Sequence, residues 1–148
     1  MPNKIHLTVA TVVVQDDKFL MVRETQQGIK VINQPAGHVE PGEDIMAAAL
    51  RETLEETAWT IKITGFLGFS NAKSATTGIT YYRHTFLAEP LQFNATAELD
   101  PDIDSAEWLS AAEIRDPSNI PRSNSVLQVL DDYEAGRIFS LEMFRNGL

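Results

Sequence analysis

The sequence contains no cysteine among its 148 residues, which excludes disulfide bonds and metal binding or catalysis by thiolates. It also lacks long apolar runs. Although 43% of the residues are hydrophobic, no stretch approaches the roughly 20 apolar residues that a membrane-spanning helix requires. The N-terminus shows no basic segment followed by an apolar stretch, so we expect no signal peptide. This length predicts one domain, residues 1–148. Because we expect no disulfide, membrane span or signal peptide, we expect a cytoplasmic protein.

Basic residues are scarce. The chain has 12 lysines and arginines against 21 aspartates and glutamates, a net charge of −9. Such a chain repels polyphosphate backbones, so we expect no nucleic-acid partner and no membrane partner. Small phosphate compounds are not excluded, because a bound divalent cation reverses the local field. The sequence gives no indication of an oligomeric state.

The order of the expected elements predicts the fold class. Residue patterns predict strands over residues 5–15, 18–24, 31–34, 61–69, 79–88 and 106–109. They predict a helix over 44–57 and a short helix that begins at the capping box of Ser110 and Glu113. A third helix is expected from residue 123 or 124 to Ala135, where Gly136 ends it. A polar loop is expected over 71–78. Strands and helices do not alternate regularly, which favours an α+β fold with a mixed sheet.

The first expected helix and the loop before it are strongly acidic. Six acidic residues fall between positions 40 and 56, opposed there by Arg51 alone: Glu40, Glu43, Asp44, Glu52, Glu55 and Glu56. At about 100° per residue, Glu52, Glu55 and Glu56 share one face of the helix. Met46, Leu50 and Leu54 lie on the opposite side and are expected to face the core.

This acidic face has two interpretations. A solvated surface is the common meaning of a charge run. Here Glu52 has no basic partner at helical spacing, and carboxylates three and four residues apart repel one another. Converging carboxylate oxygens favour a site for a hard divalent cation, Mg²⁺ or alternatively Mn²⁺.

Residues 37–59 read GHVEPGEDIMAAALRETLEETAW, and this stretch resembles the Nudix box of the Nudix hydrolases. The fixed residues of that motif occur at their places: Gly37, Glu43, Arg51, Glu52, Glu55 and Glu56. Two positions depart from it. Thr53 replaces an aliphatic residue, and Ala58 replaces a glycine, which costs about 1 kcal/mol if residue 58 is left-handed.

The resemblance implies an α/β/α sandwich and a site chemistry. Nudix hydrolases cleave pyrophosphate compounds with a divalent metal. By this resemblance Glu52, Glu55 and Glu56, with the Gly37 carbonyl, coordinate the ion, and Glu52 is also the expected base. A loop carboxylate is the alternative base: Glu98, Asp100 or Asp102. Arg51 and Glu43 are expected to orient the glutamates, although a plain ion pair between loop and helix would look the same.

Weaker candidates exist for binding the substrate. Arg23 lies on an expected strand and could meet phosphate oxygens, with a surface ion pair as the alternative. His38 directly follows Gly37 at the edge of the expected site. Tyr82 could stack on a substrate ring, but aromatic residues at strand spacing are more often part of the core.

The resemblance extends beyond the box: the stretches HLTVATVVV, NQPAGHVEPGED and DIDSAEWLSAAEI resemble one branch of bacterial phosphatases in the family. That resemblance implies small-molecule substrates: nucleoside di- and triphosphates and thiamine-type pyrophosphates, including hydroxymethylpyrimidine pyrophosphate and thiamine pyrophosphate, with phosphate released. Three alternatives stand beside it. The chain could release pyrophosphate from nucleoside triphosphates, act as a non-catalytic nucleotide-binding regulator, or merely bind metal on an acidic face.

Overall fold

The computed structural model describes residues 4–145, which form seven strands, three α-helices and a short 3₁₀ helix. The strands are β1 (Ile5–Gln15), β2 (Lys18–Gln26), β3 (Ile29–Asn33), β4 (Ala36–His38), β5 (Trp59–Lys73), β6 (Thr80–Phe93) and β7 (Ile103–Ser110). The helices are α1 (Ile45–Thr57), α2 (Ala111–Arg115) and α3 (Asn124–Glu134), and the 3₁₀ helix η1 spans Leu141–Met143.

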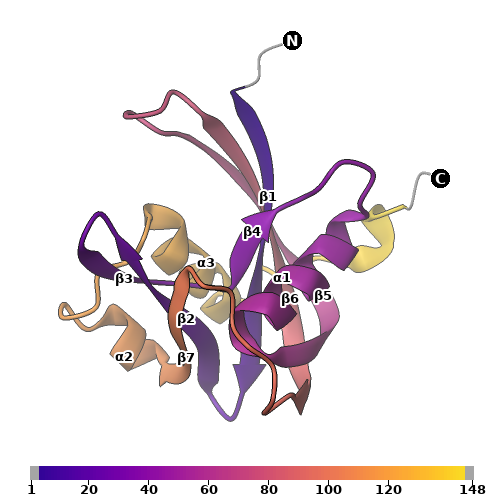
Figure 1. The fold of residues 1–148 in the computed structure, drawn as a ribbon. Coiled ribbons are helices and arrows are strands. Elements are labelled where there is room, and N and C mark those ends of the chain that lie inside the picture. The colour runs from indigo at the N-terminus through magenta and orange to yellow at the C-terminus, as the bar shows by residue number, and fades with distance from the viewer. Residues whose placement is uncertain (1–3, 146–148) are drawn as a thin grey trace.

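The sheet is mixed. Its main order is β3-β2-β1-β6-β5, with β4 paired to β1 and β7 paired to β2. The β1–β6 pair is parallel and the other pairs are antiparallel. Helix α1 lies on one side of the strands, and α2 and α3 lie on the other (Figure 1). The expected α+β fold with a mixed sheet is therefore confirmed.

Local signals in the sequence explain several boundaries. Asp16 and Asp17, which join β1 to β2, both have positive φ, at 50° and 61°, the geometry of a two-residue hairpin turn. The capping box at the start of α2 is complete, since Ser110 and Glu113 each accept a hydrogen bond from the other's backbone N–H. Gly136 has a φ of +73° directly after the end of α3, as expected for a helix terminator.

The β5–β6 hairpin is longer than the sequence predicts. Residues 71–73, assigned above to a polar loop, belong to β5, with Asn71 opposite Tyr82 and Lys73 opposite Thr80. Polar side chains at these positions are exposed, so they remain hydrated while the backbone pairs across the hairpin. Side-chain polarity therefore gave the wrong boundary here.

Helix α1 packs through small residues, contrary to the expectation for its leucines. Leu50 and Leu54 are 40% and 37% exposed, so their assignment to the core is wrong. Ala48 and Ala49 are buried instead, because short side chains let the helix approach β1 closely. Thr53, which replaces the usual aliphatic residue, is fully buried, and its hydroxyl lies 2.8 Å from the hydroxyl of Thr11 on β1.

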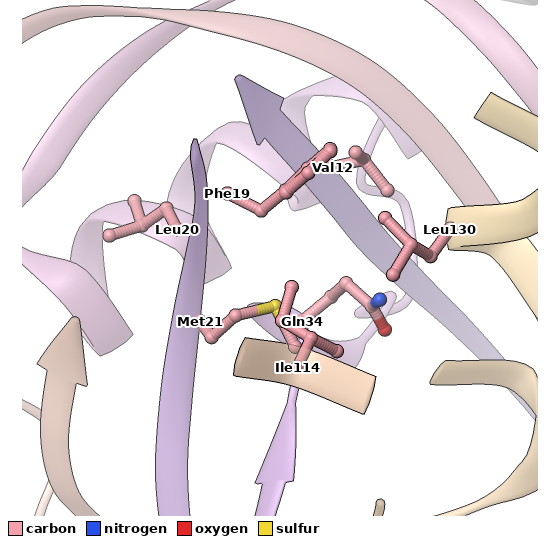
Figure 2. Close-up of a pocket in the computed structure, with 7 residues that line it drawn as sticks. All are labelled: Val12, Phe19, Leu20, Met21, Gln34, Ile114 and Leu130. Atoms are coloured by element: carbon pink, nitrogen blue, oxygen red, sulfur yellow. The ribbon is translucent and has the colours of Figure 1, made fainter. Parts of the chain in front are cut away.

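A second part of the core lies between the strands and α3 (Figure 2). Gln34 and apolar side chains from β1, β2, α2 and α3 line a cavity here that is too small to hold a water molecule. The Gln34 amide satisfies its polar atoms within the protein. Its Nε2 donates to the carbonyl of Val126 at 2.9 Å, and its Oε1 accepts from Arg83 at 2.9 Å.

Candidate active site

The short strand β4, which sequence patterns did not predict, brings the start of the acidic segment to the centre of the sheet. Gly37 is paired with Val9 and His38 with Thr8, both on β1. Asp44 then caps α1 by accepting from the backbone N–H groups of Met46 and Ala47 at 3.1 and 3.0 Å. The loop thus folds back so that α1 runs past β4.

Gly37 lies directly against Glu52 on α1. A Cβ atom on residue 37 would collide with the Cδ and both carboxylate oxygens of Glu52. Glycine at residue 37 therefore lets the backbone of β4 meet this carboxylate without displacing it. The two residues belong to different elements, and their contact defines the centre of the acidic face.

Arg51 organises the glutamates around it. It donates two hydrogen bonds to Glu43, at 2.7 and 2.9 Å, and this bonding lowers the pKa of Glu43. Arg51 also donates to Glu52 at 2.9 Å and to Glu55 at 3.3 Å. Glu52 has no basic residue at helical spacing, as stated above, but the adjacent Arg51 reaches it and supplies a basic partner that helical spacing does not predict.

Glu56 is the most buried acid on α1. Only 7% of the residue is exposed, and its carboxylate accepts from the backbone N–H of Ala36 at 2.9 Å. Burial raises the pKa of Glu56 to about 8, with Glu24, Glu52 and Asp100 adding to the effect. Burial also raises the pKa of Glu52. A buried group of like charges is costly unless a cation compensates it.

Two acids from other elements join this face. Glu24 on β2 is only 4% exposed and pairs with Arg122 at 3.0 Å; sequence reasoning missed it, because nothing in strand periodicity distinguishes it. Asp100 donates its backbone N–H to the carbonyl of Glu55 at 2.8 Å. Of the three loop acids considered, Asp100 acts electrostatically on Glu52 and Glu56, whereas Glu98 and Asp102 are exposed.

The donor set suits a hard divalent cation. It consists of the carboxylate oxygens of Glu52, Glu55 and Glu56, which bring negative charge together in a partly buried place. Within residues 4–145, no three acidic or histidine side chains stand close enough together to form a ready-made metal site. Glu52 and Glu55 accept hydrogen bonds from Arg51, so their carboxylates would have to release Arg51 in order to bind an ion.

The weaker substrate-binding candidates fall in different places. Arg23 forms an ion pair with Glu107 and donates to Asn119 at 2.9 Å. His38 lies at the edge of the site, where its Nε2 is 2.9 Å from Nδ1 of His6. The aromatic ring beside this pair belongs to Tyr81, at 5.5 Å from His6 and 6.3 Å from His38. Tyr82, its neighbour on the strand, has the opposite side-chain direction.

A family model described as the NUDIX domain matches residues 4–130. The chain belongs to the Nudix family. Its relatives include the protein named phosphatase NudJ from Escherichia coli strain K12, which is 39% identical over 140 residues; the match covers 95% of this chain and 90% of the relative. The family match therefore agrees with the Nudix box identified in residues 37–59.

Solved structures agree with this assignment. A Nudix hydrolase from Nitrosomonas europaea has a TM-score of 0.91 and 40% identity, with 97% of each chain covered. The Nudix domain of Shewanella oneidensis NrtR, solved with ADP-ribose, has a TM-score of 0.68 at 18% identity, covering 88% of this chain and 87% of that one. The latter likeness shows the fold alone.

Membership makes the chain a Nudix hydrolase, an enzyme class that hydrolyses pyrophosphate bonds and generally uses divalent metal ions. The expectations of family, fold and enzyme class are thereby confirmed. No helix within residues 4–145 is long and apolar enough to cross a membrane.

Proposed function

We propose that this chain is a Mg²⁺-dependent hydrolase that releases phosphate from nucleoside di- and triphosphates and from thiamine-type pyrophosphates. The thiamine-type substrates include hydroxymethylpyrimidine pyrophosphate and thiamine pyrophosphate. The observation that carries the proposal is the position of two glutamates against β4: the half-buried Glu52 contacts Gly37, and the buried Glu56 accepts from the backbone N–H of Ala36. Likeness to a relative named a phosphatase supports release of phosphate. We also propose one domain over residues 1–148 and a cytoplasmic location.

The proposed metal ligands are Glu52, Glu55, Glu56 and the carbonyl of Gly37. Mg²⁺ fits their hard oxygen donors, and Mn²⁺ is the alternative ion. When bound, the ion would neutralise negative charge on the pyrophosphate and make water more acidic. Glu43 supports this set indirectly, because its two hydrogen bonds fix Arg51, which in turn reaches Glu52 and Glu55.

The protein's own groups carry out the proton transfer in this proposal. A water oxygen attacks the terminal phosphorus, the bond from that phosphorus to the bridging oxygen breaks, and the water proton passes to a carboxylate. Glu52 is the proposed base, since burial raises its pKa and so increases its affinity for a proton. Asp100 is the alternative base, because its loop is bonded to α1.

The aromatic edge beside the glutamates supports a substrate that carries a ring. His6, His38 and Tyr81 pack edge to face or tilted, with ring centroids 4.9 to 6.3 Å apart. Flat rings next to Gly37 would hold a pyrimidine, purine or thiazolium ring while the phosphates reach the acidic face. The weaker candidates for substrate contact are Tyr82 and Arg23, which forms an ion pair with Glu107.

The proposal is tested by a panel of pyrophosphate compounds with Mg²⁺ or Mn²⁺, in which the first products are separated by anion exchange. We expect orthophosphate and a nucleoside diphosphate from a nucleoside triphosphate. Glu52→Gln should lose this activity, while Glu89→Gln, an exposed glutamate on β6, should keep it. Nucleoside monophosphate and pyrophosphate as the first pair would instead support the alternative, a pyrophosphohydrolase. No hydrolysis with either ion would favour a non-catalytic regulator.

A further inference from the structure

Arg83 on β6 is held by neutral groups. Its guanidinium donates to the hydroxyl of Ser125 and to the amide oxygen of Gln34, both at 2.9 Å. Two further hydrogen bonds reach Asn33 Oδ1 at 3.5 and 3.4 Å, near the outer limit for such bonds. Its Nε is buried and has no hydrogen-bond partner among the residues that the structure describes.

Among the residues that the structure describes, Arg83 also has no carboxylate partner. Arg51 and Arg122 each form an ion pair with a glutamate, but within residues 4–145 no acidic oxygen lies within 4.0 Å of the Arg83 guanidinium. Burial, and to a lesser extent the charge of Arg122, lowers the pKa of Arg83 to about 10. An arginine that served only to tie β6 to α3 would not require an uncompensated charge in this place.

The surroundings of Arg83 connect it to the acidic face. The charges of Glu24 and Glu56 both act on it. Arg122, which pairs with Glu24, lies just before α3. An open hollow of about 480 Å³ is lined by Arg122, Ser123 and Asn124, among others. Arg83 and Arg122 thus place two cationic groups close to Glu24 and Glu56, and only Arg122 of the two is paired with a carboxylate.

We propose that Arg83, assisted by Arg122, binds the substrate phosphate that the acidic face does not hold. A guanidinium donates to phosphate oxygens through two parallel N–H groups, and the charge on the phosphate supplies the missing partner. This contact fixes how far the phosphate chain extends across the site, and so determines which phosphorus faces the attacking water. The inference rests on the proposed hydrolase function and names a specificity residue for it.

Kinetics of Arg83→Gln and Arg83→Lys test the inference, with Arg115→Gln as the matched control. Arg115 pairs with Asp131 and Glu134 on the outside of α3. With a nucleoside triphosphate we expect KM to rise about tenfold to a hundredfold in Arg83→Gln, the loss typical of a charge-assisted hydrogen bond. The share of pyrophosphate among first products should also increase. Arg83→Lys should show a smaller effect on both, and Arg115→Gln none.

A purely structural role would change stability and not these ratios. Folded Arg83→Gln and Arg83→Lys proteins that both have the KM and product ratio of the parent would overturn the inference. Inorganic phosphate gives a second measurement that needs no turnover: added without metal, it should raise the Tm of the parent above that in sodium chloride of equal ionic strength. The rise should disappear in Arg83→Gln and be smaller in Arg83→Lys; an unchanged rise in Arg83→Gln overturns the inference.

These outcomes are separable from failure of the proposed function. If the parent chain hydrolyses no pyrophosphate compound with either ion, the hydrolase proposal and this inference fail together. If the parent is active while both Arg83 variants match it, only the role of Arg83 is wrong.

Discussion

The backbone of Gly37 on β4 lies against the carboxylate of Glu52 on α1, leaving no room for a side chain at residue 37. We therefore expect Gly37→Ala to displace Glu52 and lower kcat about a hundredfold or more, comparable to loss of a catalytic acid or base. Steady-state hydrolysis at saturating Mg²⁺ measures this effect. Because both changes affect one carboxylate, Gly37→Ala and Glu52→Gln should be far from additive in the double variant. Additive losses would show that the contact is unimportant.

Glu55→Gln and Glu56→Gln should each reduce turnover strongly while the fold is retained. Glutamine nearly preserves the shape of the side chain but removes an anionic oxygen ligand. At position 56 it can still accept from the backbone N–H of Ala36. Circular dichroism and Tm should match the parent or show slight stabilisation without metal, because like-charge repulsion is relieved. Parental rates in both variants at saturating Mg²⁺ would refute the catalytic role of this face.

Several features of the site could be predicted because they lie close together in the sequence. Arg51, Glu52, Glu55 and Glu56 fall within two turns of one helix, so spacing alone places them. Their surroundings could not be predicted in this way. Glu24 meets Arg122 across 98 positions, and this pairing depends on the sheet order and on the path of the chain before α3.

The fold shows the same division. Strand and helix types followed from residue patterns, but the packed face of α1 did not. Helical periodicity separates a leucine face from a glutamate face without saying how closely the helix approaches the sheet. Contact through Ala48, Ala49 and Thr53 leaves Leu50 and Leu54 partly in solvent and buries Glu56. Close backbone approach thus outweighed the burial of larger apolar side chains.

The stability of the metal-free protein should fall as pH rises from about 5 to about 8. Burial raises the pKa of Glu56 to about 8, whereas an exposed glutamate titrates near 4.3. The folded state therefore holds this proton more tightly than the unfolded state, and the resulting stabilisation is lost as pH increases through the folded pKa. Tm measured with a chelator should drop by roughly 5–10 °C over this range.

Two comparisons isolate Glu56 as the cause. Glu56→Gln cannot titrate, so its Tm should vary less with pH over the same range. Saturating Mg²⁺ should likewise flatten the dependence for the parent, because the ion stabilises the charged carboxylate and displaces the proton. If the parent and Glu56→Gln show the same dependence without metal, Glu56 is not the titrating group.

Ala58 closes α1 in the left-handed conformation, with φ 65° and ψ 13°, and its backbone N–H donates to the carbonyl of Leu54 at 2.9 Å. An L-residue with a Cβ is strained there and glycine is not, so Ala58→Gly should raise the free energy of unfolding by about 0.5–1 kcal/mol. Ala47→Gly, at an exposed position on the same helix, should instead lower it. Denaturant titration measures both. Because residue 58 carries no proposed ligand, the rate, the metal dependence and the released product should stay unchanged in Ala58→Gly. A switch in product from phosphate to pyrophosphate would mean that this turn positions the substrate, and that its role is more than conformational.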